Sequence, residues 1–116
     1  MRIRVHSQAQ ANGLVPRRLS AGRDYLVIGI SDEYFRVVND GGEPILYPKE
    51  LFEVINDTIP SDWVREDFED GEYHIEPPEV AFPGFYEDYF DHKDEARRIF
   101  EQVLARLEKV CGPRSS

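Results

Sequence analysis

Hydrophobic residues gather in short runs along the chain, and the densest succession of runs lies between positions 25 and 55. β-branched and aromatic residues dominate these runs, which turn-forming residues separate, and this arrangement is typical of successive antiparallel strands. The expected strands cover residues 25–30, 34–38, 44–48 and 51–55. The Asn-Asp-Gly-Gly sequence at 39–42 can adopt the positive φ angles that a tight hairpin needs. The sequence therefore predicts a small curled antiparallel sheet at the centre of the molecule.

The first six residues alternate, with Ile3 and Val5 on one side, which predicts a half-buried strand. Residues 7–13 are small and polar and are expected to form a loop. Residues 14–23 are expected to form a long, partly ordered connection. A long connection after the first strand suits an SH3-like barrel, and the apolar residues on both faces of 25–30 fit a central strand of such a barrel.

The segment after the sheet combines one tryptophan with a second hairpin. Trp63 is expected to close one end of the barrel as a core residue. Asp70 and Gly71 lie between two short runs at 65–69 and 72–76, which is a strong local signal for a hairpin.

Residues 79–91 contain five aromatic side chains. Phe85 and Tyr89 are four positions apart, so they share one side of a helical turn. Tyr86 and Phe90 share the neighbouring side for the same reason. We expect one of these faces to seal the barrel and the other to stay on the surface.

The clearest helical signal is at the C-terminal end of the chain. Between positions 91 and 111 apolar residues recur with helical spacing, at Ala96, Ile99, Phe100, Val103, Leu104, Leu107, Val110 and Cys111. Asp91 is expected to be the N-cap, and Gly112 followed by Pro113 is a typical stop. A helix of this length should lie across the sheet.

These elements predict one domain of class α+β over residues 1–113: a small SH3-like antiparallel β-barrel or curled sheet, with a long C-terminal α-helix packed on it. The expected parts are a β core at about 1–60, an acidic hairpin and aromatic segment at 61–91, a helix at 92–111 and a frayed tail at 114–116.

Charge is distributed very unevenly along the 116 residues, whose net charge is −9. Residues 62–95 hold 13 acidic and 2 basic residues, a net charge of −11. Such a field repels nucleic acid and anionic lipid and attracts basic partners. The competing explanations are solubility and the protection of strand edges against aggregation by charge.

The chain carries features of a cytoplasmic protein. The one cysteine, Cys111, cannot form an intramolecular disulfide, which favours a reducing compartment. The first residues lack the apolar region of a secretory signal, and no apolar run approaches the ~20 residues that span a bilayer. We therefore expect a cytoplasmic location and no membrane partner.

The residues offer little for catalysis. The three histidines, His6, His74 and His92, stand among different elements. Gly41-Gly42 precedes no helix and is a turn, not a phosphate cradle. The acidic run at 66–72 lacks the ligand spacing of a calcium loop, and the basic residues are too dispersed for nucleic-acid binding. We expect no enzyme activity, no metal, no cofactor and no small-molecule substrate.

The acidic third of the chain is also where aromatic residues stand between carboxylates. Carboxylates steer basic partners, and aromatic side chains are effective anchors. The predicted partner-binding residues are Glu66, Asp67, Glu69, Asp70, Glu72, Tyr73, Glu76, Glu79, Tyr86, Glu87, Asp88 and Tyr89.

The whole pattern resembles a known group of small acidic bacterial proteins. The resemblance lies in the sequences YLVIGI at 25–30, YFRVVN at 34–39, PILYP at 44–48, LFEVI at 51–55, IPSDW at 59–63 and PGFYEDYF at 83–90. These are similar to immunity proteins of contact-dependent growth inhibition and related polymorphic toxin systems. The resemblance implies a non-enzymatic inhibitor, a monomer that binds the C-terminal domain of a cognate toxin 1:1 and blocks a basic nuclease cleft.

A second hypothesis is an SH3-like adaptor that binds a basic host protein or peptide. Its signature would be an exposed groove of Tyr25, Tyr34 and Tyr47 in place of the acidic hairpin.

Overall fold

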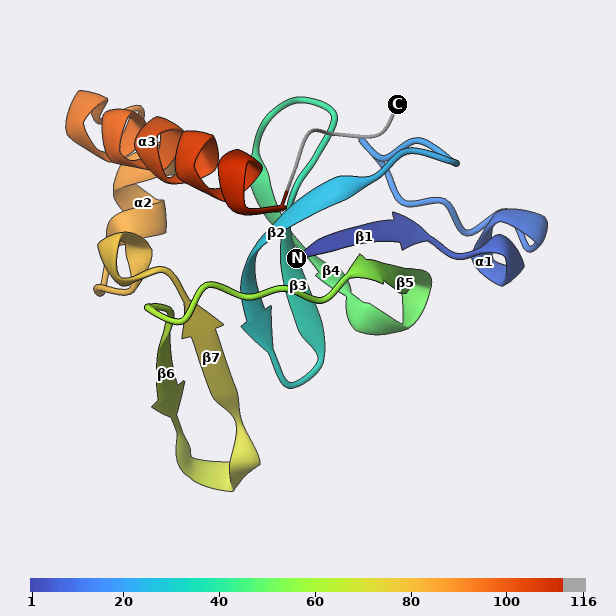
Figure 1. Ribbon diagram of the computed structural model, residues 1–116, viewed down its shortest axis with the longest axis horizontal. Helices are drawn as coiled ribbons and strands as arrows, with labels where there is room; N and C mark the ends of the chain where they lie inside the picture. The colour runs from blue at the N-terminus through green and yellow to red at the C-terminus, as the bar shows by residue number, and fades with distance from the viewer. Residues whose placement is uncertain (112–116) are drawn as a thin grey trace.

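The computed structural model describes the backbone of residues 1–111 and the side chains of residues 1–109, and it shows an antiparallel sheet with helices packed against it (Figure 1). The strands are β1 Arg2–Val5, β2 Tyr25–Ser31, β3 Tyr34–Val38, β4 Pro44–Pro48, β5 Phe52–Asn56, β6 Val64–Asp67 and β7 Tyr73–Glu76. The helices are α1 Ser7–Ala11, α2 Phe85–Phe90 and α3 Asp94–Cys111, with 3-10 turns η1 Lys49–Leu51, η2 Glu69–Gly71 and η3 Pro78–Val80. The α+β class is therefore confirmed.

Strand β2 is the centre of the sheet because it pairs with three other strands. The order is β4-β3-β2-β1-β5, and β7 pairs with β2 and β6. On one edge, the first half of β2 pairs with β1 and its last residues pair with β7, at Ile30↔Ile75 and Ser31↔His74. On the other edge, its register with β3 shifts between Val27 and Gly29.

The sheet is open. Its end strands β4 and β5 have no pairing with each other within the described residues, so the expectation of a closed SH3-like barrel is wrong. The three-residue turn η1 carries the chain from one edge strand to the other without a ladder between them. The curled antiparallel sheet and the C-terminal helix are confirmed.

The core is one cluster of buried side chains, contributed by strands β1 to β5 and by the helices α2 and α3. All of β2 from Tyr25 to Ile30 is buried, as expected for a central strand. The stripe on α3 is buried at Ala96, Phe100, Val103 and Leu107, and each large apolar side chain buried in this way stabilises the fold by roughly 1.5–3 kcal/mol. Trp63 is also buried, which confirms its predicted place in the core.

Two local predictions were wrong. The expected loop at 7–13 contains helix α1, because the His6 ring accepts a hydrogen bond from the backbone N–H of Ala9 (2.9 Å) and caps the helix. Asp91 is not the N-cap of the long helix. It lies at the C-terminal end of α2, and the left-handed residue His92 (φ 62°) separates α2 from α3, which begins at Asp94.

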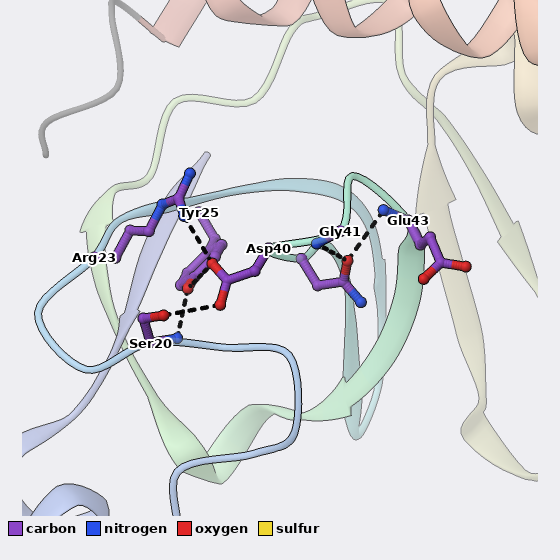
Figure 2. Close-up of polar contacts among 7 residues, drawn as sticks. Ser20, Arg23, Tyr25, Asp40, Gly41 and Glu43 are labelled. Atoms are coloured by element: carbon purple, nitrogen blue, oxygen red, sulfur yellow. Dashed lines mark hydrogen bonds and ion pairs between the residues drawn. The ribbon is translucent and has the colours of Figure 1, made fainter.

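The long connection between β1 and β2 is held by the turn between β3 and β4 (Figure 2). The Asp40 carboxylate accepts hydrogen bonds from the Tyr25 hydroxyl (2.7 Å), the Ser20 hydroxyl (2.8 Å) and Arg23 (2.9 Å). The Asn39 side-chain oxygen accepts from the backbone of Gly41 and Glu43 and closes the turn. The charge-assisted hydrogen bonds to Asp40 fix the conformation of the connection between β1 and β2.

Part of the prediction lies outside the described residues: the stop at Gly112-Pro113, the frayed tail 114–116 and the side chain of Cys111. Among the helices that the structure describes, none has the length and apolar character needed to cross a membrane.

Candidate functional site

The β6–β7 hairpin projects from the body of the sheet (Figure 1), and every residue of β6 is exposed. Cross-strand pairing places Glu66 opposite His74 and Val64 opposite Glu76. Because side chains alternate along a strand, these four residues share one face. The pairings of β2 with β7 and β3 extend that face over Ser31, Gly29 and Arg36. We call it the outer sheet face; its members are Gly29, Ser31, Tyr34, Arg36, Leu46, Val64, Glu66, His74 and Glu76.

A first hollow of about 290 Å³ lies over Gly29 on this face. Its lining includes four acidic residues, together with Tyr34, Leu46, Arg36 and His74. The four acids are Asp32, Glu33, Glu72 and Glu76. A Cβ atom at Gly29 would stand 3.3 Å from the Cβ of Arg36 and 4.0 Å from the Cβ of Glu76, so a larger residue there would crowd the floor of the hollow.

A second hollow of about 330 Å³ lies between the hairpin and the segment leading into α2. Two exposed aromatic side chains line it, Phe68 (41% exposed) and Phe82 (47% exposed). Phe68 packs edge-on against His74, with ring centroids 4.8 Å apart. Arg36, His74 and Glu76 line both hollows, so the two lie next to each other across β7, and we refer to them together as the groove.

Arg36, Tyr86 and Glu76 form the half-buried centre of the groove. The Arg36 guanidinium lies 3.8 Å from the centroid of the Tyr86 ring and donates a hydrogen bond to the Pro44 carbonyl oxygen (2.9 Å). Burial lowers the pKa of Arg36 and raises the pKa of Glu76. The charges of His74 and Arg36 offset part of the rise at Glu76.

The Tyr86 hydroxyl at this centre is buried and has no hydrogen-bond partner among the described residues. Burial raises the pKa of this hydroxyl, so it is a neutral donor at physiological pH. A buried polar group without a partner costs stability.

Five of the twelve predicted binding residues line the groove: Glu66, Glu72, Glu76, Tyr86 and Glu87. Glu69 and Asp70 lie exposed at the hairpin tip. Asp67 and Tyr73 are on the opposite face of the hairpin. There Asp67 pairs with Arg65 (3.0 Å), and the half-buried Tyr73 ring has Lys49 and Arg65 over it.

The remaining three predicted residues lie away from the groove. Glu79 forms an ion pair with Arg106 of α3, which lowers the pKa of Glu79. Asp88 is exposed on α2. Tyr89 is only 5% exposed, because its ring packs on Phe100 at 4.8 Å between centroids. The expectation that Tyr89 anchors a partner at the surface is therefore wrong.

The tyrosine groove of the adaptor hypothesis does not form. Tyr25 and Tyr47 are buried, and only Tyr34 is exposed. The Tyr47 hydroxyl is used internally, donating to the Arg17 carbonyl oxygen at 3.0 Å.

Sequence reasoning named Tyr34 only for the groove of the adaptor hypothesis. It missed several other groove residues, namely Asp32, Glu33, Arg36, Leu46, Phe68, His74 and Phe82. The alternation of β3 places Tyr34 and Arg36 opposite the buried Phe35 and Val37, and this signal was present in the sequence. The pairing of β7 with β2 brings together residues more than 40 positions apart in the sequence, and no local sequence pattern predicts it.

The groove combines carboxylates with exposed aromatic side chains. Within residues 1–109 no three His, Cys, Asp or Glu side chains gather closely enough to hold a metal ion. Carboxylates beside exposed aromatic rings suit a ligand that is cationic and partly apolar. No protein-family model, curated protein or solved structure matches this chain.

Proposed function

We propose that this protein binds and neutralises a basic toxin domain, as immunity proteins of polymorphic toxin systems do. One observation carries the proposal: five acidic residues of the hairpin and groove face solvent and form no ion pair with any described residue. Among the described residues, none forms a salt bridge at Glu66, Glu69, Asp70, Glu72 or Glu87. Carboxylates without a cationic neighbour gain no stability from ion pairing, and their charge is available to a basic partner.

Uncompensated surface charge of this density acts mainly on association. Complementary charges raise association rate constants from about 10⁵–10⁶ to as much as 10⁸–10⁹ M⁻¹ s⁻¹ at low salt. An inhibitor that must reach its toxin before the toxin reaches its target gains from such steering. The exposed rings of Phe68 and Phe82 supply apolar contact area once the partners meet.

Inhibition in this proposal is occlusion. The projecting hairpin covers the basic cleft with which a nuclease domain holds its phosphate substrate. The protein acts as a monomer, 1:1 with the toxin, in the cytoplasm.

The test is rescue from toxicity. The C-terminal domain encoded by the adjacent upstream reading frame is expressed in a bacterial host, with and without this protein, and growth is followed. Growth should stop without the protein and resume with it. The variant Glu66→Lys/Glu72→Lys/Glu87→Lys, which reverses three exposed groove acids, should slow association at least tenfold at low salt and reduce rescue.

The matched control is Glu53→Lys/Asp57→Lys/Glu108→Lys, which makes the same charge change at exposed positions outside the groove. It should rescue like the wild type. Thermal unfolding of both variants shows whether each is folded. Failure of the wild-type protein to rescue, or equal rescue by the two triple variants, contradicts the proposal.

A further inference from the structure

We infer that the groove reads a two-residue feature of its partner: an arginine or lysine side chain enters the hollow over Gly29, and a neighbouring apolar side chain packs between Phe68 and Phe82. The identification of the partner as a toxin domain rests on the proposed function. The preference of the hollow for a cationic side chain depends only on the residues that line it.

The shape of the first hollow depends on the absence of a side chain at one point. Gly29 forms the floor, and the side chains of Arg36 and Glu76 rise on either side of it. Tyr34 and Leu46 add apolar wall on the β3–β4 side. A long side chain with an apolar stem and a charged end can therefore lie on Tyr34 and Leu46 and direct its charge towards the acids.

The charge of the hollow favours a cation. Four carboxylates line it, and one guanidinium stands against them. Arg36 is already engaged, because its guanidinium lies on the Tyr86 ring and bonds the Pro44 carbonyl oxygen. Within the described residues no salt bridge forms at Asp32, Glu33 or Glu72. An incoming cation would supply the missing counter-charge, and it would relieve the cost of burying Glu76.

Arginine suits this hollow better than lysine. Its planar guanidinium can bond two carboxylates at once and stack on an aromatic ring, whereas lysine presents a compact point charge. Tyr34, 41% exposed, supplies such a ring at the rim.

The second hollow completes the recognition. Phe68 and Phe82 stand exposed on its walls, which is costly in water and favourable once an apolar side chain covers them. Tyr86 lines the same hollow and carries the Arg36 guanidinium over its ring, 3.8 Å from the ring centroid. Since both hollows meet at His74 and Glu76, the basic and the apolar side chain belong to one short segment of the partner.

The test is an NMR titration of the ¹⁵N-labelled protein with Nα-acetyl-arginine N-methylamide. Nα-acetyl-citrulline N-methylamide, which has nearly the same shape and no charge, is the control ligand. The arginine ligand should shift the amide signals of Gly29, Ser31 and His74 with a dissociation constant in the millimolar range, as expected for one side chain. The citrulline ligand should leave these signals in place.

Two double variants test whether the acids of the hollow, and not the overall negative charge of the protein, bind the arginine ligand. Asp32→Asn/Glu72→Gln removes two charges at exposed positions of the hollow and should weaken arginine binding at least threefold. Glu53→Gln/Asp57→Asn removes two charges elsewhere and should leave binding unchanged. Equal shifts with both ligands, shifts centred away from Gly29, or equal effects of the two double variants overturn the inference.

The outcomes distinguish this inference from the proposed function. Rescue from toxicity without arginine-specific shifts refutes the two-residue recognition alone. Arginine-specific shifts without rescue refute the toxin-inhibitor function alone and leave the hollow as a site for the basic side chain of another protein.

Discussion

At the scale of single residues, two tyrosine hydroxyls stand in opposite situations. The Tyr25 hydroxyl donates to Asp40 (2.7 Å) and accepts from the Ser20 backbone N–H (2.6 Å). The Tyr86 hydroxyl is buried with no partner in the described residues. The same atom type therefore stabilises the fold at one position and costs stability at the other.

This contrast gives a prediction for two identical chemical changes. Tyr25→Phe should lower the free energy of unfolding by about 1–2 kcal/mol, because it removes two hydrogen bonds and leaves Asp40 short of a donor. Tyr86→Phe should leave it unchanged or raise it by up to about 1 kcal/mol, because no bond is lost and the ring stays under Arg36. Urea unfolding measures both. Equal losses in the two variants would contradict the hydrogen-bond assignment.

Glu76 yields a prediction that depends on pH. Burial raises the pKa of Glu76 above its ordinary value, while His74 and Arg36 act to lower it and Glu66 adds to the rise. A group whose pKa is higher in the folded state than in the unfolded state loses stabilising effect as the pH rises through its folded pKa. The variant Glu76→Gln has no carboxyl group to ionise, so its free energy of unfolding does not fall in this way as the pH rises.

The variant Glu76→Gln should thus be more stable than the wild type at pH 7, and the difference should vanish near pH 4. The gain stays below about 1 kcal/mol, because water screens a partly exposed carboxylate. Urea unfolding at the two pH values gives the comparison, with Glu53→Gln on β5 as the exposed control. A variant that is less stable than the wild type at pH 7 would show that ionised Glu76 stabilises the fold.

At the scale of elements, the β6–β7 hairpin is the least supported part of the sheet. Every residue of β6 is exposed, and among the described strands β6 pairs only with β7. In turn β7 pairs with β2 at only two positions. Elements with few buried contacts open locally at a lower free energy than the core.

We therefore predict a large difference in amide hydrogen exchange between two strands of one sheet. The amides of β2 should exchange near the rate set by global unfolding, while those of β6 should exchange at least a hundredfold faster. Binding of the partner over the hairpin should slow exchange in β6 and leave β2 unaffected. Equal protection in the free protein would show that the hairpin unfolds together with the core.

The elements also show what local pattern can predict. The strands of the meander, the Asp70-Gly71 hairpin and the long helix follow from alternation, turn residues and helical spacing, and the structure has all of them. Helix α1 was missed because its cap is a histidine ring, which is a rare N-cap. For α2 the spacing identified two aromatic faces but not which one faces inward; contact with Phe100 on α3 decides that.

The sequence predicted most of the acidic residues of the candidate site, but it did not predict which other residues lie beside them. The acidic residues were identified because they are concentrated in one stretch of the chain. Their partners in the groove, Gly29, Tyr34 and Arg36, come from strands that carry no unusual charge. Only the pairing of β7 with β2 brings the two groups together, and strand pairing depends on the whole fold.

At the scale of the whole molecule, the negative charge is concentrated in one part of the sequence. The acidic segment 62–95 forms the hairpin, α2 and part of the groove. In the sequence, residues 96–116 carry a net charge of +3 from 5 basic and 2 acidic residues. Repulsion within the acidic part opposes folding, and salt screens it over a Debye length of about 8 Å at physiological ionic strength.

Added sodium chloride should therefore raise the melting temperature by a few degrees between about 0.02 and 0.3 M salt. The groove variant Glu66→Lys/Glu72→Lys/Glu87→Lys should show a smaller rise than the control Glu53→Lys/Asp57→Lys/Glu108→Lys, because it relieves repulsion where acids are densest. Calorimetry at several salt concentrations measures this. A melting temperature that falls with salt would mean that attractive ion pairs outweigh the repulsion.

The way β2 divides its edge between β1 and β7 has a consequence for how such a protein can change over time. The first residues of β2 pair with β1 in the centre of the fold. Its last two residues pair with β7 and hold the β6–β7 hairpin, an appendage that contributes little to the core. Mutations on the appendage can thus accumulate and redirect recognition towards new targets while the architecture behind it stays intact. The proposed toxin-inhibitor function would gain from this arrangement, because the binding surface could change without loss of the fold.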